Sequence, residues 1–477
     1  MRESQMEPVN PADRRSRSVA RSGIGAELRA TLALAAPLAA ANLAQMAMGV
    51  TDAVMVGRLG AVPLAAAGLG AMLYFTGGVM LQGILSAVSP LVAHALGAGD
   101  RGAAGRITGA GLALAMVLAL PFVVVLTSLD RLLHTLGYDA ALAAEIGRFL
   151  HAIAWGGFAF LSFGVLRSLF AALSRTRAVM AVLLVCVAGN AMLNWVLIYG
   201  RLGAPALGVA GSGYASAINQ WLMLAGLALC TRMTPGLAAL RVLRSALTPR
   251  RIEMANILRL GLPIGGIMGI EVGVFLAAGI LMGLLGAAAL GAHQLVLNCA
   301  SITFMVPLGL SQAATVRVAY ELGAAREFAA RRAGFVALAL GTLFMGATSA
   351  VLWTFPRAII AAYVDVADPA NRDVVQIAWR LLAIAALFQV FDGMQVIAAG
   401  ALRGYKDTMT PMLLAAFGYW GAGFAGGWLL AFPLGYGPVG LWCGLALGLA
   451  VVAILLTLRL HRLAPPISGV AQAVAAR

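Results

Sequence analysis

Charged residues are scarce in this chain of 477 residues. Asp, Glu, Lys and Arg together make up 11% of it, whereas a soluble protein carries about a quarter. Hydrophobic residues make up 61%, and the mean hydropathy is +0.92. A water-facing surface cannot be built from this mixture, which excludes an ordinary soluble protein. We therefore expect a polytopic integral membrane protein that is surrounded mostly by the lipid bilayer.

Cysteine is also scarce, and the signatures of common enzymes and metal sites are missing. The sequence has no HExxH, no Walker A loop, no nucleophile elbow and no paired Asp-rich motif for a metal-bound diphosphate. The few cysteines are far apart in apolar runs, without the spacing of metal ligands. We thus predict that the protein is not an enzyme and needs no cofactor. The four cysteines are Cys186, Cys230, Cys299 and Cys443.

The net charge of +15 could suggest nucleic acid as a partner. However, the basic residues do not gather on a soluble domain that also carries aromatic side chains. They lie in short segments between apolar runs, where they report on membrane topology. We expect no nucleic-acid binding.

Twelve apolar runs are long enough to cross a membrane, which takes about 20 residues as a helix. The sequence therefore predicts an all-α protein with twelve transmembrane helices. The predicted spans are 31–57, 64–97, 107–129, 149–173, 178–200, 207–231, 255–285, 289–322, 333–355, 376–402, 409–432 and 438–460.

The placement of the basic residues supports this number of spans. If the N-terminus is cytoplasmic and the twelve spans alternate in direction, 26 of the 33 basic residues fall in cytoplasmic segments. Arg167 and Arg403 are counted among these 26. Because cytoplasmic loops are enriched in Lys and Arg, we predict that both termini are cytoplasmic. The seven exceptions are Arg58, Arg131, Arg148, Arg201, Arg357, Arg372 and Arg380.

The chain also repeats itself at a distance of 226 to 232 residues. Residues 83–97 (GILSAVSPLVAHALG) align with 309–323 (GLSQAATVRVAYELG), and 173–180 (LSRTRAVM) align with 405–412 (YKDTMTPM). A third alignment, between 36–60 and 262–286, matches Pro37 with Pro263, Gly57 with Gly283 and Gly60 with Gly286.

An even number of spans in each repeat makes both halves enter the membrane from the same side. We therefore expect two six-helix bundles related by a pseudo-two-fold axis along the membrane normal, with a central cavity between them. The predicted domains are a cytoplasmic tail (1–27), an N-terminal bundle (28–231), a basic cytoplasmic linker (232–254), a C-terminal bundle (255–462) and a second cytoplasmic tail (463–477).

Three acidic residues lie inside predicted spans and away from the span ends: Asp52, Glu271 and Asp392. A carboxylate in the hydrocarbon region costs about 2.5–3.5 kcal/mol on an insertion scale. No Arg or Lys is expected in mid-span near them, so we favour cation binding or protonation over a role as structural hydrogen-bond anchors. In the repeat alignment, Glu271 is opposite Gln45 and Asp52 is opposite Ala278. The two bundles should therefore have different tasks.

Other polar residues in the spans allow a functional or a structural interpretation. Asn190 and Asn194 are one helical turn apart, and they either line the cavity or bridge helices. His293 and Gln294 open the eighth span and are candidates for the cavity wall. Pro37 should kink the first span, as a passive bend or as a moving hinge.

At these residues the chain resembles the multidrug and toxic compound extrusion (MATE) family, and within it the NorM-type bacterial branch. The similarity covers about residues 30 to 460. It implies two six-helix bundles in a V shape that alternate between outward-open and inward-open states, and cation-driven efflux of amphiphilic, often cationic, drugs and dyes. The segments that carry it are TDAVMVGRLG (51–60), LVAHALGAGD (91–100), GNAMLNWVLIYG (189–200), GLPIGGIMGIEVGVF (261–275), LGAHQLVLN (290–298) and FDGMQVIAAGALRGYKDT (391–408).

The resemblance also implies roles for individual residues. Glu271 and Asp392 match the acids of the cation site in the C-terminal bundle, so they would bind Na⁺ or a proton. Phe388, one turn before Asp392, stands where some sodium-coupled relatives carry Tyr, which leaves both coupling ions open. Gln294 matches a position associated with substrate contact. The positions that match polar residues of the N-terminal cavity are Asp52, Asn190 and Asn194.

We thus predict a secondary multidrug antiporter that exports mainly cationic organic compounds in exchange for Na⁺ or H⁺. We expect it as a monomer in the bacterial inner membrane. A lipid-intermediate flippase is the alternative within transport, but it should have extra spans and a basic cavity for pyrophosphate. A membrane-embedded enzyme would need a catalytic cluster at one membrane face. A passive channel would work without an imposed ion gradient.

Overall fold

The computed structural model describes residues 23–135, 137 and 139–463. Most of the two predicted tails, residues 1–22 and 464–477, lies outside the described residues. The described chain is almost entirely helical and contains no β-strand. This confirms the predicted all-α class.

The described residues of the first half of the chain form eight helices. The third predicted span is α5 and the fourth is α6 with α7, which meet at a bend of 46°. The second span contains a short break between α3 and α4. The bounds are α2 Ile24–Gly57, α3 Ala61–Leu85, α4 Val88–Gly97, α5 Arg101–Thr135, α6 Ala140–Ala154, α7 Gly157–Ala172, α8 Thr176–Tyr199 and α9 Val209–Met233.

The predicted linker contains two short helices, and the second half of the chain follows it. The eleventh span is interrupted by the π-helix η2, which separates α17 from α18. The bounds are α10 Pro235–Ala238, α11 Val242–Leu247, α12 Arg251–Leu284, α13 Ala287–Gly323, α14 Glu327–Thr354, α15 Pro356–Ala361, η1 Pro369–Asn371, α16 Arg372–Gly404, α17 Met409–Ala416, η2 Phe417–Ala425, α18 Gly426–Ala431 and α19 Gly437–Leu463.

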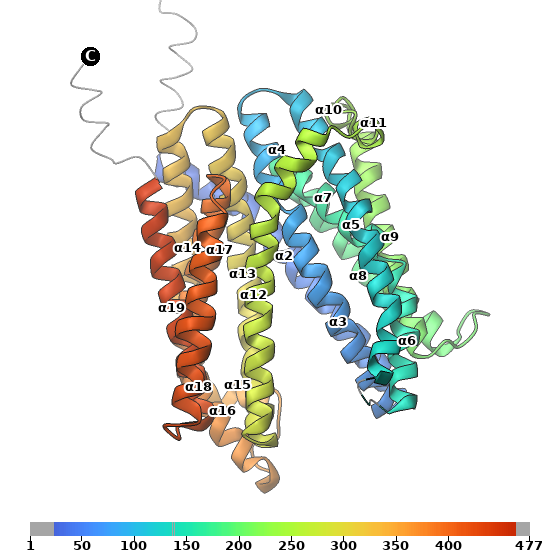
Figure 1. The fold of residues 1–477 in the computed structure, drawn as a ribbon, viewed down its shortest axis with the longest axis vertical. Coiled ribbons are helices and arrows are strands. Elements are labelled where there is room, and N and C mark those ends of the chain that lie inside the picture. The colour runs from blue at the N-terminus through green and yellow to red at the C-terminus, as the bar shows by residue number, and fades with distance from the viewer. Residues whose placement is uncertain (1–22, 136, 138, 464–477) are drawn as a thin grey trace, which may run out of the picture.

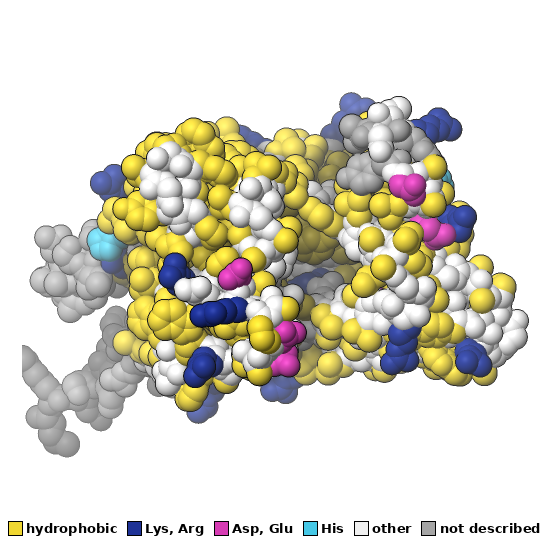
Figure 2. Space-filling view, turned by 90° about the horizontal axis from the view of Figure 1, so that it is seen from below, with side chains coloured by type: hydrophobic (Ala, Val, Ile, Leu, Met, Phe, Trp, Pro, Cys, Tyr) yellow, Lys and Arg dark blue, Asp and Glu magenta, His cyan; other side chains and the backbone are white. Residues whose placement is uncertain are grey.

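Within the described ranges, ten helices are long and apolar enough to cross a membrane. The number rises to twelve if two bent pairs each form one span: α6 with α7, and α9 with the segment that ends at Leu247. Large apolar side chains such as Val124, Val125 and Leu343 are exposed on the outside, and yellow hydrophobic atoms cover much of the surface in Figure 2. Such an exterior is stable only against lipid.

The predicted internal repeat is visible in the backbone. Gly60 and Gly286, aligned in the sequence, each precede the second long helix of their half and have φ angles of 122° and 118°. Ser174 and Lys406, also aligned, both adopt left-handed conformations with φ of 58° and 61°. Because non-glycine residues rarely take such angles, the match indicates two copies of one fold.

The two copies form lobes arranged as a V (Figure 1). We call α2–α9 the N lobe and α12–α19 the C lobe. The lobes meet at the end where α2 begins and α19 ends, through α2 against α13, α3 against α12, and α4 against α13. We call this the closed end. Towards the opposite, open end, α3 and α12 diverge, and a hollow is visible between the lobes in Figure 2.

Candidate cation and substrate sites

Asp52 on α2 is held by side chains from two other helices of the N lobe. Asn194 Nδ2 on α8 donates to Asp52 Oδ1 at 2.6 Å, and Ser216 Oγ on α9 donates to Asp52 Oδ2 at 3.0 Å. Hydrogen bonds to charged groups contribute about 1.5–3 kcal/mol each. These two bonds stabilise the carboxylate, and both interpretations of Asp52, cation binding or protonation and a structural anchor, are compatible with them.

The two asparagines of the predicted N-lobe cluster are both buried. Asn194 Nδ2 also donates to the backbone oxygen of Asn190 at 3.0 Å. Ser216, which sequence analysis missed, completes the cluster. Its signal was the run of polar residues Ser212, Ser216 and Asn219 at helical spacing in the sixth span.

In the C lobe, Glu271 on α12 and Asp392 on α16 are close enough to interact electrostatically. Asp392 is 6% exposed, and its Oδ1 accepts one hydrogen bond from Gln395 Nε2 at 3.3 Å. Two carboxylates in a low-dielectric site repel each other when both are ionised. Gln395 is the one side chain among the described residues with a hydrogen bond to the pair, so a bound cation or a proton would relieve the repulsion between the two acids.

A small pocket adjoins Glu271. Its wall contains three aromatic side chains and several aliphatic ones, which exclude water and strengthen the field of the carboxylates. The lining residues are Glu271, Val274, Phe275, Phe388, Tyr419, Gly423, Leu445 and Leu449.

Phe388 is the centre of an aromatic chain behind this pocket. Its ring centroid lies 6.1 Å from that of Phe275 and 5.4 Å from that of Trp442. Trp442 Nε1 donates to Nδ1 of His293 at 3.1 Å. His293 is fully buried, so the structure places this predicted cavity residue inside the C lobe, on the far side of Trp442.

The remaining predicted residues lie on α13 and α2. Gln294 and Asn298, one turn apart on α13, are both exposed, as a polar cavity wall requires. α2 runs without interruption through Pro37, so the predicted hinge position is part of a continuous helix.

The expectation that no basic residue is near the acids needs one correction. Arg403, in the last turn of α16, is 8% exposed and interacts electrostatically with Glu271. The sequence reading had assigned it to a cytoplasmic segment, because it lies near a span end. Burial by the neighbouring helices brings its charge into the lobe.

Arg167 on α7, which the sequence analysis also assigned to a cytoplasmic segment, makes hydrogen bonds between helices. Its guanidinium donates to the side-chain oxygens of Gln45 at 3.1 Å and Gln312 at 3.0 Å, and also to Asn42 Oδ1. Gln312 is on α13, whereas the other partners are on α2. The arginine thus links the N lobe to the C lobe through neutral acceptors.

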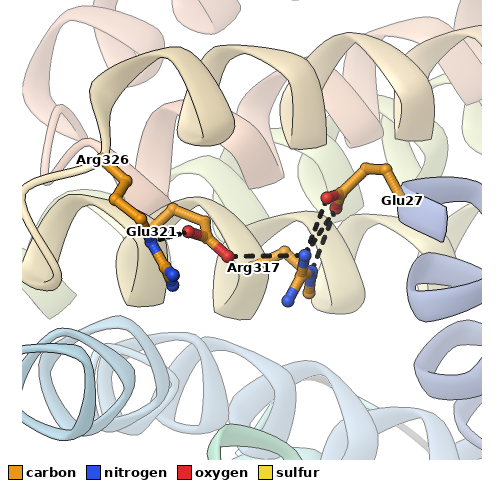
Figure 3. Close-up of polar contacts among 4 residues, drawn as sticks. All are labelled: Glu27, Arg317, Glu321 and Arg326. Atoms are coloured by element: carbon orange, nitrogen blue, oxygen red, sulfur yellow. Dashed lines mark hydrogen bonds and ion pairs between the residues drawn. The ribbon is translucent and has the colours of Figure 1, made fainter. Parts of the chain in front are cut away.

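The closed end carries an ion-pair network between the lobes (Figure 3). Arg317 on α13 binds both carboxylate oxygens of Glu27 on α2 at 2.8–3.0 Å, and Glu27 is 3% exposed. Arg317 also lies 3.5 Å from Glu321, which pairs with Arg326 at 2.6 Å. Sequence analysis had assigned Arg317 and Arg326 only to cytoplasmic segments.

Close backbone packing accompanies this network. A Cβ atom added to Gly83 on α3 would lie 2.8 Å from the Cα of Gly265 on α12. One added to Gly309 on α13 would lie 2.8 Å from the backbone nitrogen of Ala39 on α2. Gly83 and Gly309 are equivalent in the repeat, so the lobes are sealed by symmetric contacts between small residues.

The MatE family model matches residues 37–196 and 263–429, and the two matches start 226 residues apart, like the repeat. This chain belongs to the MatE family. It is therefore a membrane transporter and not an enzyme, as the sequence predicted. The resemblance to the NorM-type branch is confirmed as well.

Two curated relatives show how closely this MatE transporter matches that branch. It is 44% identical to a probable multidrug resistance protein NorM from Mesorhizobium japonicum, over 93% of this chain and 96% of the relative. It is 45% identical to the multidrug resistance protein NorM of Burkholderia vietnamiensis, over 90% and 93% respectively.

A solved outward-facing multidrug resistance MATE family transporter of the MOP superfamily has the same fold. The TM-score is 0.83 at 18% identity, over 92% of this chain and 97% of the other. Together with the lobes described above, this confirms the predicted V-shaped fold.

Proposed function

We propose that this MatE transporter exports amphiphilic, mainly cationic organic compounds in exchange for Na⁺ or H⁺. The observation that carries the proposal is the pair Glu271 and Asp392, two carboxylates that share a low-dielectric site without enough hydrogen bonds. The multidrug resistance names of the relatives support small drugs as substrates.

The carboxylate pair provides a physical basis for coupling. Ionised and empty, the two groups repel each other at a cost that a bound cation or a proton removes. If the ion binds one arrangement of the lobes more tightly than the other, it shifts the equilibrium between them, since only differential affinity can do so. A cation gradient can thereby drive the cycle.

In the other state of the transport cycle, the contacts at the closed end must open. The Glu27–Arg317 pair and the packing of Gly83 on Gly265 hold the lobes together there. Alternating access requires these contacts to separate while the open end closes. In the orientation indicated by the basic residues, the closed end faces the cytoplasm and the structure is open to the outside.

Drug binding belongs in the hollow between the lobes, with Asp52 and Gln294 as contributors. Arg167 lies on the closed-end side and donates to three neutral side-chain oxygens. Arg403 offsets one of the three acids, so the balance is acidic and we expect a preference for cationic substrates. We further propose a monomer in the inner membrane, with the domain boundaries and cytoplasmic termini given by the sequence.

Efflux from proteoliposomes tests the proposal. Purified protein is reconstituted, a cationic dye such as ethidium is loaded, and sodium and proton gradients are imposed separately. We expect efflux only with a cation gradient of the correct direction. Export without any gradient, or export of anionic dyes in preference to cationic ones, would contradict the proposal.

Orientation is tested by cysteine labelling in a variant without native cysteines. Positions 250 and 251, in the predicted linker, should not react with a membrane-impermeant reagent added from the periplasmic side. Strong labelling there would overturn the proposed topology.

A further inference from the structure

Three hydroxyls buried in the C lobe have no hydrogen-bond partner among the described residues, and one of them lines the candidate cation pocket. It belongs to Tyr419, which is 4% exposed and lies on the π-helix η2. A buried hydroxyl without a partner is destabilising, so such groups require an explanation, for example an ion that binds there.

Tyr419 lies at the candidate cation site. Its side chain lines the same pocket as Glu271 and Phe388. It also interacts electrostatically with both Glu271 and Asp392. Three oxygen-bearing side chains therefore converge from three different elements: α12, α16 and η2.

The helix that carries Tyr419 is anchored beside Glu271. Trp420 Nε1 donates to the backbone oxygen of Ile270 at 3.3 Å, and Ile270 directly precedes Glu271 in α12. This bond fixes the position of η2 relative to the acid.

The π-helix explains how the tyrosine can face the acids while its helix packs tightly on α19. A Cβ atom added to Gly448 on α19 would lie 2.6 Å from the Cα of Gly423 and 2.7 Å from the backbone oxygen of Gly418. Residues five apart in an α-helix point about 140° away from each other. The wider turn of a π-helix brings Gly418 and Gly423 onto one face, which leaves Tyr419 beside them to face the pocket. Such π-turns are frequent at functional sites.

The chemistry of the site calls for an additional oxygen. Glu271 and Asp392 supply carboxylate oxygens, and a hard cation takes further oxygen ligands from neutral groups. Sodium is a hard cation that prefers oxygen ligands. Phe388 offers none, whereas the Tyr419 hydroxyl adds a neutral oxygen from the same pocket wall.

We infer that the Tyr419 hydroxyl is an additional ligand of the coupling ion in the C-lobe pocket, beside Glu271 and Asp392. This inference rests on the proposed function and requires Na⁺ as the coupling ion, because a proton needs no additional oxygen ligand. It also gives η2 a function. Phe388 has no hydroxyl to offer to the pocket, and η2 places the hydroxyl of Tyr419 there instead.

The test measures the initial rate of ethidium efflux from proteoliposomes against external Na⁺ concentration. Tyr419→Phe removes only the hydroxyl. The KM for Na⁺ should rise by roughly tenfold, as expected for the loss of one interaction with a charged group, while the KM for the dye stays unchanged. Tyr405→Phe is the matched control, because Tyr405 in the same lobe also has a buried hydroxyl without a partner but does not line the pocket. It should leave the KM for Na⁺ unchanged.

A second variant tests ligation independently of any folding defect. Phe388→Tyr introduces a hydroxyl into the same pocket, so it should lower the KM for Na⁺ in the Tyr419→Phe background and restore part of the sodium dependence. If Tyr419→Phe does not reach the membrane, Phe388→Tyr alone should lower the KM for Na⁺ relative to wild type, and an unchanged value overturns the inference.

The outcomes separate this inference from the proposed function. Efflux driven by sodium with an unaltered KM for Na⁺ in Tyr419→Phe overturns the ligand role. Efflux driven only by protons overturns the sodium site and leaves cation-coupled export standing. Efflux that needs no gradient overturns the proposed function itself.

Discussion

Gly97 and Gly323 occupy equivalent positions in the two repeats, and each packs against the backbone of the other repeat. A methyl group on Gly97 would overlap the backbone oxygen of Tyr320, and one on Gly323 would overlap the backbone oxygen of His94. His94 and Tyr320 are themselves 226 residues apart. The pseudo-two-fold axis therefore passes between α4 and α13, at a contact that closes only if both positions lack a side chain.

Gly323→Val should consequently prevent closure at this end. We expect gradient-driven efflux to be lost. The protein should still reach the membrane, but with the lobes separated at the end that is closed in this structure. The measurement is the labelling of a cysteine placed at Glu321 in a variant without native cysteines, which should react faster from the cytoplasmic side. Gly346→Ala on α14, where an added Cβ meets nothing within 4 Å, is the control. Normal efflux by Gly323→Val would mean that this contact is not needed.

Glu271→Gln and Asp392→Asn retain the shape of each side chain and remove its charge. Each should abolish efflux driven by a cation gradient, since the site no longer favours the loaded state. Drug binding to detergent-purified protein should persist at least in part. Glu145→Gln, which changes an acid on α6 paired with Arg148 at 2.7 Å, should transport normally. Wild-type rates in the double variant Glu271→Gln, Asp392→Asn would remove the basis of the coupling mechanism.

Asp52→Asn should be milder and should depend on the substrate. The amide oxygen can still accept from Asn194, and its NH₂ group can donate to the Ser216 hydroxyl, so the N-lobe cluster should survive the exchange. The KM for cationic dyes is expected to rise several-fold by the loss of one charged contact, with the dependence on the coupling ion unchanged. An effect as large as that of Glu271→Gln would place Asp52 in the coupling site.

Glu27→Gln should weaken the seal at the closed end. Removal of one partner from a buried ion pair destabilises a protein by about 3–5 kcal/mol. The loss should be smaller here, because Arg317 keeps its contact with Glu321. We expect a lower midpoint of thermal unfolding and faster labelling at the closed end. Asp407→Asn breaks the Arg459–Asp407 pair at 2.9 Å, which lies within the C lobe, and should not change the labelling. Equal labelling in both variants would show that the Glu27 pair does not hold the lobes together.

Several features of this protein could be predicted from the sequence because each depends on local composition. Apolar runs of sufficient length define spans in any bilayer, and a carboxylate such as Glu271 is conspicuous there because its insertion is costly. The equivalence of Gly60 and Gly286 is visible because both copies of the fold keep glycine where φ is positive. These signals lie within a few residues of one another or recur at a constant spacing.

The tertiary structure decided which of these residues meet. Glu27 and Arg317 are 290 positions apart, and no pattern near either residue indicates the other. Asp52 accepts hydrogen bonds from Ser216 and Asn194 on two other helices, whereas Asp392 accepts one from Gln395 on its own helix. This difference depends on which helices pack beside each acid. Tyr419 looks like any aromatic residue of an apolar span until the π-helix turns it towards the acids. Contacts between distant helices are set by packing, which composition and spacing do not encode.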